Sequence, residues 1–538
     1  MIAMKLLKIL IAGYCSCAAS LSTAAVDVLS FGAKGDGTTS DTAAIQAAID
    51  HAAERGGEVR FPSGTYLSGT LILKDDVTLH LERGAVLLGS TRREEYPPTP
   101  SHYVSHVNRY THSSLLYAEG AKNIAITGEG IIDGQGTHPA FAADEEDELK
   151  SILRRPYLIR FISCERVKIS GVTLRNSPAW MQHYLDCRDL SVDGITVFNH
   201  GNYNNDGIDI DNCRNVRIVN SSFDTDDDAI CFKTTNATGK CENVVVANCV
   251  IASNCNALKW GTETNGAFLN FTVSNCALWR SEHPTIYPRD ERTLGAIALE
   301  TVDGALVDGI HIDNIVSNGF MTPIFIRLAD RGRNYYDGGP SQPAGILRNV
   351  SISNMTATMH GLVTSSISGL AGHPVQNVSL TNIRIVCEGG GSQEDAARRD
   401  MGDRNKEYPE TLIFADAPAY GLFVRNVEGL TMQQLFLEVR NNDPRAALYC
   451  ERVADMRLHG FTFDDPDEEA PAIVLNQCRN IQISGNLPVG SHRTLLQVEG
   501  AESDRILLYD NDLSVYERPV TFERGAKKKA VKLAGNFF

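Results

Sequence analysis

Asn215-Val-Arg-Ile-Val-Asn220 and Asn243-Val-Val-Val-Ala-Asn248 are two copies of one phrase, and they begin 28 residues apart. Apolar and polar side chains alternate within each copy, which predicts a short β-strand. Through the middle of the chain the starts lie 23 to 28 residues apart, too close for a strand and a packed helix in each unit. In an antiparallel sandwich, the hairpins would not repeat one strand sequence at one constant spacing. We therefore predict an all-β, single-domain, right-handed parallel β-helix, in which the repeats stack as coils. Further copies begin at positions 123, 166, 189, 270, 349, 377 and 480.

The open ends of such a solenoid need a cover, because an uncovered coil presents unpaired strand edges. Residues Thr39–Arg55 predict an amphipathic helix, capped by Ser40 or Asp41, that plugs the first coil. Its expected apolar face is Ala44, Ile45, Ala48 and Ile49. Five long loops are predicted to leave the solenoid where the period is interrupted, at Arg92–Ser114, Thr137–Leu153, Glu282–Leu294, Arg331–Pro343 and Gly389–Pro409.

The first residues have the features of an export signal. Lys5 and Lys8 precede the apolar stretch Ile9–Ala19, and the small residues Ser22-Thr-Ala24 follow it. We expect residues 1–24 to be a signal peptide and residues 25–538 to form the β-helix catalytic domain. The apolar stretch is too short to span a membrane, so the predicted location is the periplasm or the medium.

The composition narrows the range of partners. Apolar residues make up 43% of the 538 residues and charged residues 22%, which excludes wholesale disorder. The formal net charge of −16 disfavours binding to nucleic acid or to an anionic membrane surface. We expect a monomer.

Eleven cysteines follow the predicted signal peptide. An exported protein with several cysteines suggests disulfides, but these cysteines recur at one place in the repeat. We expect a stacked ladder of buried thiols, without disulfides or a metal site. The residues of this ladder are Cys164, Cys187, Cys213, Cys241 and Cys478.

The densest acidic stretch reads Asp206-Gly-Ile-Asp209-Ile-Asp211 and then Asp224-Thr-Asp226-Asp227-Asp228. Solvated turns and an empty cation site are two interpretations of such a stretch. Asp206 and Asp228 are 22 residues apart, close to one coil, so both are expected on the same side of neighbouring coils. Crowded carboxylates separate one another's pKa values, and hydrolysis of a glycosidic bond needs one carboxyl to donate a proton and another to activate water. The spacing therefore indicates a hydrolytic site.

These residues resemble motifs of the polygalacturonase-type pectin hydrolases, glycoside hydrolase family 28. Asn204-Asn-Asp206-Gly is similar to the family's Asn-Thr-Asp-Gly, and Asp226-Asp227-Asp228-Ala is similar to Gly-Asp-Asp-Cys. The resemblance covers roughly residues 27 to 380 and includes Asn176-Ser-Pro-Ala-Trp180. It implies an inverting hydrolase of pectic glycans without a cofactor. It also implies that Asp227 is the general acid, that Asp206 and Asp228 hold the attacking water, and that Asn204 binds substrate.

Two departures from the family motifs change the expected substrate. Asn256 stands where the family's Gly-His-Gly has histidine, and Ala298-Leu-Glu300 replaces Arg-Ile-Lys, which binds the carboxylate of the substrate. A galacturonate carboxylate would meet Glu300 where lysine is usual. We therefore expect a different sugar, neutral at the cleaved bond, in a pectic side chain or a rhamnogalacturonan-type backbone. Other substrate-binding candidates are Lys233, Lys259 and Arg327, with Trp260 either a platform for a sugar ring or a core residue.

Three alternatives remain open at this stage. Loops at Glu282–Leu294 and Arg331–Pro343 that close one end of a cleft would favour exo action. A β-helix polysaccharide lyase would use Ca²⁺ held by carboxylates of Asp224–Asp228. A glycan-binding solenoid without catalysis is the third alternative, because the family's histidine, arginine and lysine are replaced.

Overall fold

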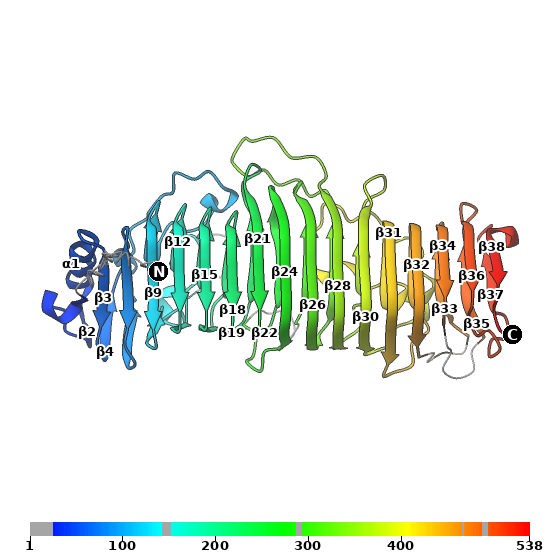
Figure 1. Ribbon diagram of the computed structural model, residues 1–538, viewed down its shortest axis with the longest axis horizontal. Helices are drawn as coiled ribbons and strands as arrows, with labels where there is room; N and C mark the ends of the chain where they lie inside the picture. The colour runs from blue at the N-terminus through cyan, green and yellow to red at the C-terminus, as the bar shows by residue number, and fades with distance from the viewer. Residues whose placement is uncertain (1–24, 143–151, 287–292, 465–466, 468, 487–492) are drawn as a thin grey trace, which may run out of the picture.

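The computed structural model describes residues 25–142, 152–286, 293–464, 467, 469–486 and 493–538. The predicted signal peptide lies outside these ranges, so export stays a prediction. All 38 described strands join one parallel sheet that winds along the long axis of the molecule (Figure 1). The predicted parallel β-helix is confirmed. No helix in the described part of the chain is both long and apolar enough to cross a membrane.

The first coils have three faces, here named A, B and C. Face A stacks β1 (Val26–Asp27), β3 (Gly57–Phe61), β6 (Val77–Leu81), β9 (Lys122–Gly128), β12 (Glu165–Ser170), β15 (Arg188–Asp193), β18 (Arg214–Val219) and β21 (Lys240–Ala247). Face B stacks β2 (Asp36–Ser40), β4 (Gly64–Ser68), β7 (Ala85–Gly89), β10 (Ile131–Asp133), β13 (Thr173–Arg175), β16 (Thr196–Asn199), β19 (Ser222–Thr225) and β22 (Val250–Ser253). Face C stacks β5 (Leu71–Ile72), β8 (Ser114–Glu119), β11 (Tyr157–Ile162), β14 (Gln182–Leu185), β17 (Ile208–Asp211), β20 (Ile230–Thr234), β23 (Leu258–Thr264), β25 (Gly295–Thr301), β27 (Thr322–Leu328) and β29 (Ser365–Ser368).

Faces A and B then merge into long strands, while face C continues separately. The merged strands are β24 (Ala267–Arg280), β26 (Leu306–Phe320), β28 (Ile346–Met359) and β30 (Val375–Cys387). Two strands, β31 (Ala419–Val439) and β32 (Ala446–Phe463), pair along all faces. The last coils contribute β33 (Pro471–Asn476), β35 (Thr494–Glu499) and β37 (Val520–Glu523) to face C, and β34 (Arg479–Ser484), β36 (Asp504–Tyr509) and β38 (Val531–Ala534) to face A.

The repeated phrase stacks on itself because of the asparagines at its ends. Asn215 and Asn243 have φ angles of 58° and 59°, in the left-handed region that asparagine tolerates better than most residues. The Asn243 side-chain amide donates to Asn215 Oδ1 at 3.0 Å, and that of Asn270 donates to Asn243 Oδ1 at 3.2 Å. Each asparagine thus turns the chain and bonds to the coils on both sides. Val216 lies beside Val244 in the register, which places phrase on phrase.

The cysteines form the predicted buried ladder. Cys164, Cys187, Cys213 and Cys241 are buried and free, and the Cys187 backbone N–H donates to Cys213 Sγ at 3.3 Å. Cys478 is also buried and free, but it lies far along the solenoid, where its thiol donates to the Cys450 carbonyl at 3.4 Å. Their role is to pack the interior.

The N-terminal helix α1 (Thr42–Ala53) covers the first coil, as Figure 1 shows. It begins later than the predicted Thr39 because β2 takes residues up to Ser40. Its buried face is Ile45, Ala48, Ile49 and Ala52, so Ala52 replaces the predicted Ala44. Asp41 precedes the helix but does not cap it through its side chain. Its carboxylate accepts the backbone N–H groups of Lys34 and Gly35 at 2.6 and 3.0 Å instead.

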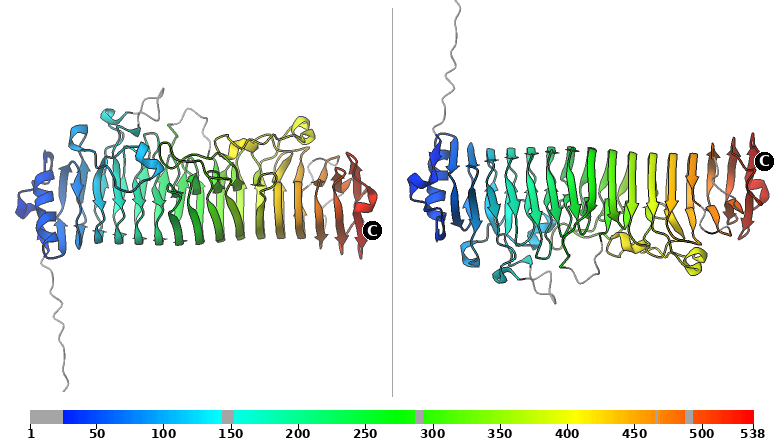
Figure 2. Two further views of the ribbon diagram at one scale, coloured as in Figure 1. Left: turned by 90° about the horizontal axis from the view of Figure 1, so that it is seen from above. Right: turned by 90° about the horizontal axis from the view of Figure 1, so that it is seen from below.

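Inserted loops project from one side of the solenoid (Figure 2). The predicted loop Arg92–Ser114 contains two single-turn helices, η2 (Arg93–Glu95) and η3 (His106–Arg109). The loop Gly389–Pro409 contains α3 (Gln393–Ala397). Parts of the predicted loops Thr137–Leu153 and Glu282–Leu294, including Tyr287, lie outside the described residues.

Candidate active site

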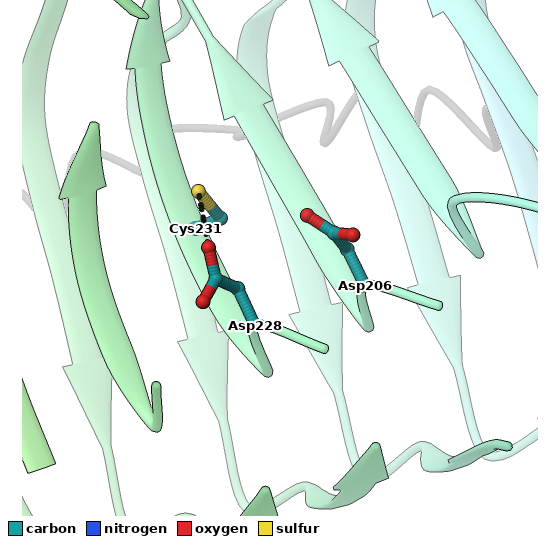
Figure 3. Close-up of side chains that lie close together, drawn as sticks. All are labelled: Asp206, Asp228 and Cys231. Carbon is teal, nitrogen blue, oxygen red and sulfur yellow. Dashed lines mark hydrogen bonds between the residues drawn. The ribbon is translucent and has the colours of Figure 1, made fainter. Parts of the chain in front are cut away.

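Asp206 and Asp228 occupy equivalent places on neighbouring coils, directly before β17 and β20. The Gly207 backbone N–H donates to the Asp228 carbonyl at 2.9 Å, which sets the two aspartates one strand apart. Figure 3 shows their carboxyl groups beside the Cys231 thiol, and one ligand atom from each of the three lies within 4.8 Å of the others. The expectation that both aspartates lie on one side of the solenoid is confirmed.

Asp227 lies next to this pair and is the more exposed carboxyl, because it is half-buried whereas Asp206 and Asp228 are buried. Its carbonyl accepts hydrogen bonds from the hydroxyls of Thr225 at 2.6 Å and Ser253 at 2.8 Å. Its Oδ1 accepts the Asp228 backbone N–H at 2.9 Å. Neighbouring coils thus hold the backbone of Asp227 in place at the rim of the site.

The other acids of the segment point to partners of their own. Asp224 Oδ1 is 2.8 Å from His200 Nε2 and accepts the Ser281 hydroxyl at 2.7 Å. Asp226 accepts the Asn254 amide at 2.9 Å and the Ile286 backbone N–H at 3.0 Å. The five-residue segment therefore divides, with only Asp227 and Asp228 turned towards Asp206.

A Ca²⁺ site does not fit this geometry. Among the described residues, the two groupings close enough to hold a metal are Asp206, Asp228 and Cys231, and Asp227, Asp228 and Cys255. Calcium takes six to eight oxygen ligands, whereas each grouping offers two carboxylates and a thiol. The calcium ligands that a lyase would require from Asp224–Asp228 are therefore not assembled in the described part of the chain.

Asn256 orients Asp228. Its side-chain amide donates to Asp228 Oδ1 at 2.7 Å, and its own Oδ1 accepts the Gly295 backbone N–H at 3.0 Å. The residue in the family's histidine position thus positions a carboxylate and cannot titrate. Asn204 is half-buried, and its Oδ1 accepts Arg155 Nη2 at 2.7 Å.

Two buried lysines lie among these acids. Lys259 Nζ is 3.6 Å from Asp228 Oδ2 and 2.6 Å from Glu410 Oε1. Lys233 Nζ is 3.2 Å from Glu263 Oε2 and 3.5 Å from Asp209 Oδ1. It also lies 4.8 Å from the centre of the Trp180 ring. Both predicted lysines therefore lie in the site, but each is already paired with carboxylates of the protein.

Glu263 and Glu410 were not predicted from the sequence. They follow no motif, and Glu410 is 151 residues from the lysine it meets.

The two cations missing from Ala298-Leu-Glu300 have counterparts one strand away. Lys259 is the register partner of Ala298, and Arg327 is the register partner of Glu300. Ala298 itself is fully buried in an apolar cluster with Phe325 and Phe414. Positive charge has thus moved to the flanking strands instead of being lost.

Three of the predicted binding residues require correction. Trp260 is fully buried against Phe232 and Phe271, so it is a core residue and no sugar platform. Glu300 is also fully buried, which contradicts the expectation that a substrate carboxylate meets it. Arg327 donates to the Arg404 carbonyl at 2.9 Å and to Ser368 Oγ at 3.0 Å. It supports the loop above it, and the neighbouring Glu300 carboxyl acts on its charge. Alternation along the strand decides the orientation of Trp260, whereas Glu300 and Arg327 lie on the same side of face C as Lys259 and are buried among its charged neighbours.

Burial and like charge shift the proton equilibria of the site. Burial, with Asp209 and Asp227 nearby, raises the pKa of Asp206 well above its usual range. Burial also raises the pKa of Glu300. Burial alone would lower the pKa of Lys259, but Asp228 and Glu410 raise it, so this lysine stays charged. The site therefore holds carboxyls whose pKa is raised beside a lysine that keeps its charge.

Loops bound the site on two sides. Residues 399–410, here the 399–410 segment, run along face C: Glu410 reaches Lys259 on β23, the Arg404 carbonyl accepts from Arg327 on β27, and Arg399 pairs with Glu499 on β35. From the loop Arg92–Ser114, the Tyr110 hydroxyl donates to Glu263 Oε1 at 3.3 Å. The site is thus a recess whose C-terminal side is occupied by protein.

Comparison with known proteins gives a consistent result. The profile of glycosyl hydrolases family 28 matches residues 99–399, more than half of the chain. An exo-poly-alpha-D-galacturonosidase of Dickeya chrysanthemi is 32% identical over 253 residues, which are 38% of this chain and 41% of that protein. The chain thus matches less than half of that relative's length. An exopolygalacturonase of Zea mays is 24% identical over 378 residues, 68% of this chain and 84% of that protein.

Among solved structures, a family 28 exopolygalacturonase of Yersinia enterocolitica is similar with a TM-score of 0.63 at 22% identity, over 80% of this chain and 78% of that one. At this identity the similarity supports the fold.

Proposed function

Because this chain belongs to glycosyl hydrolases family 28, we propose that it hydrolyses a glycosidic bond of a pectic glycan with inversion at the anomeric carbon. The observation that carries the proposal is the pair Asp206 and Asp228 on adjacent coils, with Asp227 beside them at the rim. Asp227 donates its proton to the glycosidic oxygen as the bond to the anomeric carbon breaks. Water between Asp206 and Asp228 transfers a proton to a carboxylate as its oxygen bonds to that carbon.

Asn256 and Lys259 support this division of roles. A neutral amide donor at 2.7 Å and an ammonium at 3.6 Å both contact the Asp228 carboxyl and orient it for the proposed role of base. Asp227 is half-buried at the rim, where a leaving group has access to it. Asn204, at the half-buried edge of the same recess, is the proposed contact for a sugar hydroxyl.

For the substrate, we infer a rhamnogalacturonan-type or side-chain pectic glycan with a neutral sugar at the cleaved bond. Lys233 and Lys259 are both already paired with protein carboxylates, Lys233 with Glu263 and Asp209 and Lys259 with Glu410. A uronate at the cleaved position would have to displace one of these pairs. The second candidate is exo release of galacturonate, which is favoured by the name of the Dickeya relative.

Exo action is the proposed mode for either substrate. The 399–410 segment lies over face C from β35 to β23, so a long glycan has no free path along face C on the C-terminal side. This segment, and not the predicted loops Glu282–Leu294 and Arg331–Pro343 alone, forms the obstruction. A pectic substrate is also consistent with the predicted export, and the monomeric state stays a prediction.

A panel of defined oligosaccharides tests the function. Reduced oligogalacturonate, rhamnogalacturonan fragments and neutral pectic side-chain oligosaccharides are digested by the full chain and by the Asp227→Asn variant. We expect release of one terminal sugar at a time from a rhamnogalacturonan or side-chain substrate, and none with the variant. Release from oligogalacturonate alone would support the second candidate. Unsaturated products would establish a lyase, and glycan binding without any product would establish the non-catalytic alternative.

A further inference from the structure

A second charged hollow, here the arginine pocket, lies on face C near the C-terminal end of the solenoid. It has a volume of about 430 Å³ and is lined by Arg399, Arg425, Glu451, Arg452, Gln477 and Arg524, among others. It is built mainly from β31, β32, β33 and the turns that follow β35 and β37, beyond residue 399 where the family match ends. Six strand steps of ~4.8 Å separate β23 from β33, so the pocket is about 29 Å from Lys259. The 399–410 segment lies between the two sites.

The pocket forms at the corner after face C, where a glycine interrupts a stacked column of long side chains. At the corner after face C, Arg452, Gln477, Gly500 and Arg524 follow one another on successive coils, all with left-handed φ angles of 51°, 55°, 82° and 49°. Gly500 contributes no side chain, and a Cβ there would lie 2.8 Å from Gln477 Cγ. The missing side chain leaves a gap between Gln477 and Arg524.

The floor of the pocket is fixed by paired charges. Arg399 donates three hydrogen bonds to the buried Glu499 carboxylate, at 2.8 to 3.1 Å. Arg425 Nε lies 3.2 Å from Glu451 Oε2. The Arg399–Glu499 pair is fully hydrogen-bonded and forms a rigid wall, whereas Arg425 and Glu451 form an ion pair without a hydrogen bond between Nε and Oε2.

Arg452 and Arg524 stand at the rim. Arg452 donates Nε to Asn426 Oδ1 at 2.9 Å and pairs with Glu451, whereas Arg524 is less fully used. Their side chains are 34% and 57% exposed. Arg524 makes one charged contact, from Nε to Glu499 Oε2 at 3.4 Å, and its two Nη groups make no hydrogen bond with any residue that the structure describes. Four arginines meet three carboxylates here, Asp400 and Glu451 in the lining and Glu499 in the floor, which leaves one positive charge in excess in a chain whose net charge is −16. This place is therefore selectively favourable to anions.

We propose that the arginine pocket binds the carboxylates of a uronate-containing glycan, as an auxiliary site separate from the catalytic recess. A planar guanidinium suits a planar carboxylate because two parallel hydrogen bonds form at once. Arg452 and Arg524 are three strand steps apart, about 14 Å, which requires an oligomer with several carboxylates. The choice of a pectic uronate rests on the proposed function, whereas the carboxylate chemistry rests on the arginines alone. The auxiliary site holds acidic stretches of polymer while a terminal sugar is cleaved in the recess.

Binding to an inactive background tests this site without depending on hydrolysis. Titration calorimetry compares galacturonate oligomers with neutral galactan oligomers of equal length, using the full-length Asp227→Asn protein. We expect the uronate oligomer to bind and the neutral one to bind at least tenfold more weakly. Adding Arg452→Gln and Arg524→Gln should weaken uronate binding at least tenfold. The matched control is Arg479→Gln with Arg505→Gln, which removes two exposed arginines of face A on the two coils between Arg452 and Arg524 and should change binding less than twofold.

A second variant guards against misfolding of the first. Ala501→Glu adds a carboxylate to the pocket lining without removing any ion pair, and it should also abolish uronate binding there. Unchanged binding in both pocket variants, or equal binding of neutral oligomers, would overturn the proposal. If no pectic glycan is hydrolysed but the pocket variants still lose uronate binding, the proposed function fails and the auxiliary site stands. If hydrolysis occurs and the pocket variants bind uronate normally, the proposed function stands and the auxiliary site fails.

Discussion

Face A and face C of the same coils follow different rules. On face A, Val216, Val244 and Phe271 stack on one another, and the asparagines at the strand ends stack likewise. On face C the stacked residues change at every coil: His183, Asp209, Cys231, Lys259, Ala298 and Phe325. On face A residues of the same kinds turn and pack the chain in every coil. A catalytic site on face C needs different chemical groups side by side. Changes on face A should therefore affect stability, and changes on face C should affect chemistry.

The largest expected effect is on catalysis at the rim of face C. Asp227→Asn removes the proposed proton donor and should lower kcat by about 10²–10⁴-fold, the usual contribution of a general acid. The thermal midpoint should stay close to that of the parent. Asp224→Asn is the control within the same acidic segment, because Asp224 is occupied by His200 and Ser281. Equal losses in both variants would contradict the assignment of Asp227.

A loss of both stability and activity is expected at the buried lysine of the recess. Lys259→Met leaves the Asp228 and Glu410 carboxylates without their shared counter-ion. Removing one partner of a buried ion pair costs about 3–5 kcal/mol in the free energy of unfolding, which urea denaturation measures. Lys240→Met, at the half-buried start of β21, should cost less than about 1 kcal/mol. A small loss at Lys259 would mean that the recess is solvated and the pairing unimportant.

A moderate loss of stability alone is expected on the asparagine ladder. Asn248→Ala removes hydrogen bonds to Asn220 and Asn275 and places alanine at a φ of 57°. Together these changes should cost about 1–2 kcal/mol in the free energy of unfolding. Asn248→Gly should cost less, since glycine accepts this conformation. Both variants should retain parental kcat; a loss of activity would show that face A and face C are coupled.

The smallest effect is a pH dependence of stability. The pKa of Asp206 is raised in the folded protein, so the folded state holds this proton more tightly than the unfolded chain. The stabilisation is complete below the ordinary carboxyl pKa of 3.8 and is lost as the pH rises through the raised folded value. Asp206→Asn should therefore be more stable than the parent at neutral pH, with a smaller difference at pH 4. Chemical denaturation across this range measures it, and a parent that is more stable at neutral pH would be the contrary result.

The repeated part of the molecule could be predicted from the sequence. Alternation and period place the strands, the asparagines mark the turns, and a separation of 22 residues puts Asp206 beside Asp228. Each of these features is local or recurs once per coil.

The unrepeated part could not be predicted in the same way. Glu410 reaches Lys259 only because the 399–410 segment crosses seven strand steps from β35 to β23, and no periodic signal records such a path. Lys259 and Trp260 are adjacent in sequence but face opposite sides of β23, so a pattern that identifies the strand does not say which of them meets the recess. Glu300 was expected to contact substrate because it occupies the lysine position of a family motif. A motif position alone does not say whether the side chain is exposed.

Proton NMR of a digest, followed from the first minutes, tests the central claim most directly. A pectic oligosaccharide that the panel identifies as substrate is incubated with the parent and with Asp227→Asn. We predict that the first anomeric signal to appear has the configuration opposite to that of the cleaved bond, and that it is absent with the variant. A first product of retained configuration, or an inverted product formed equally fast by Asp227→Asn, would contradict the roles assigned to the three aspartates.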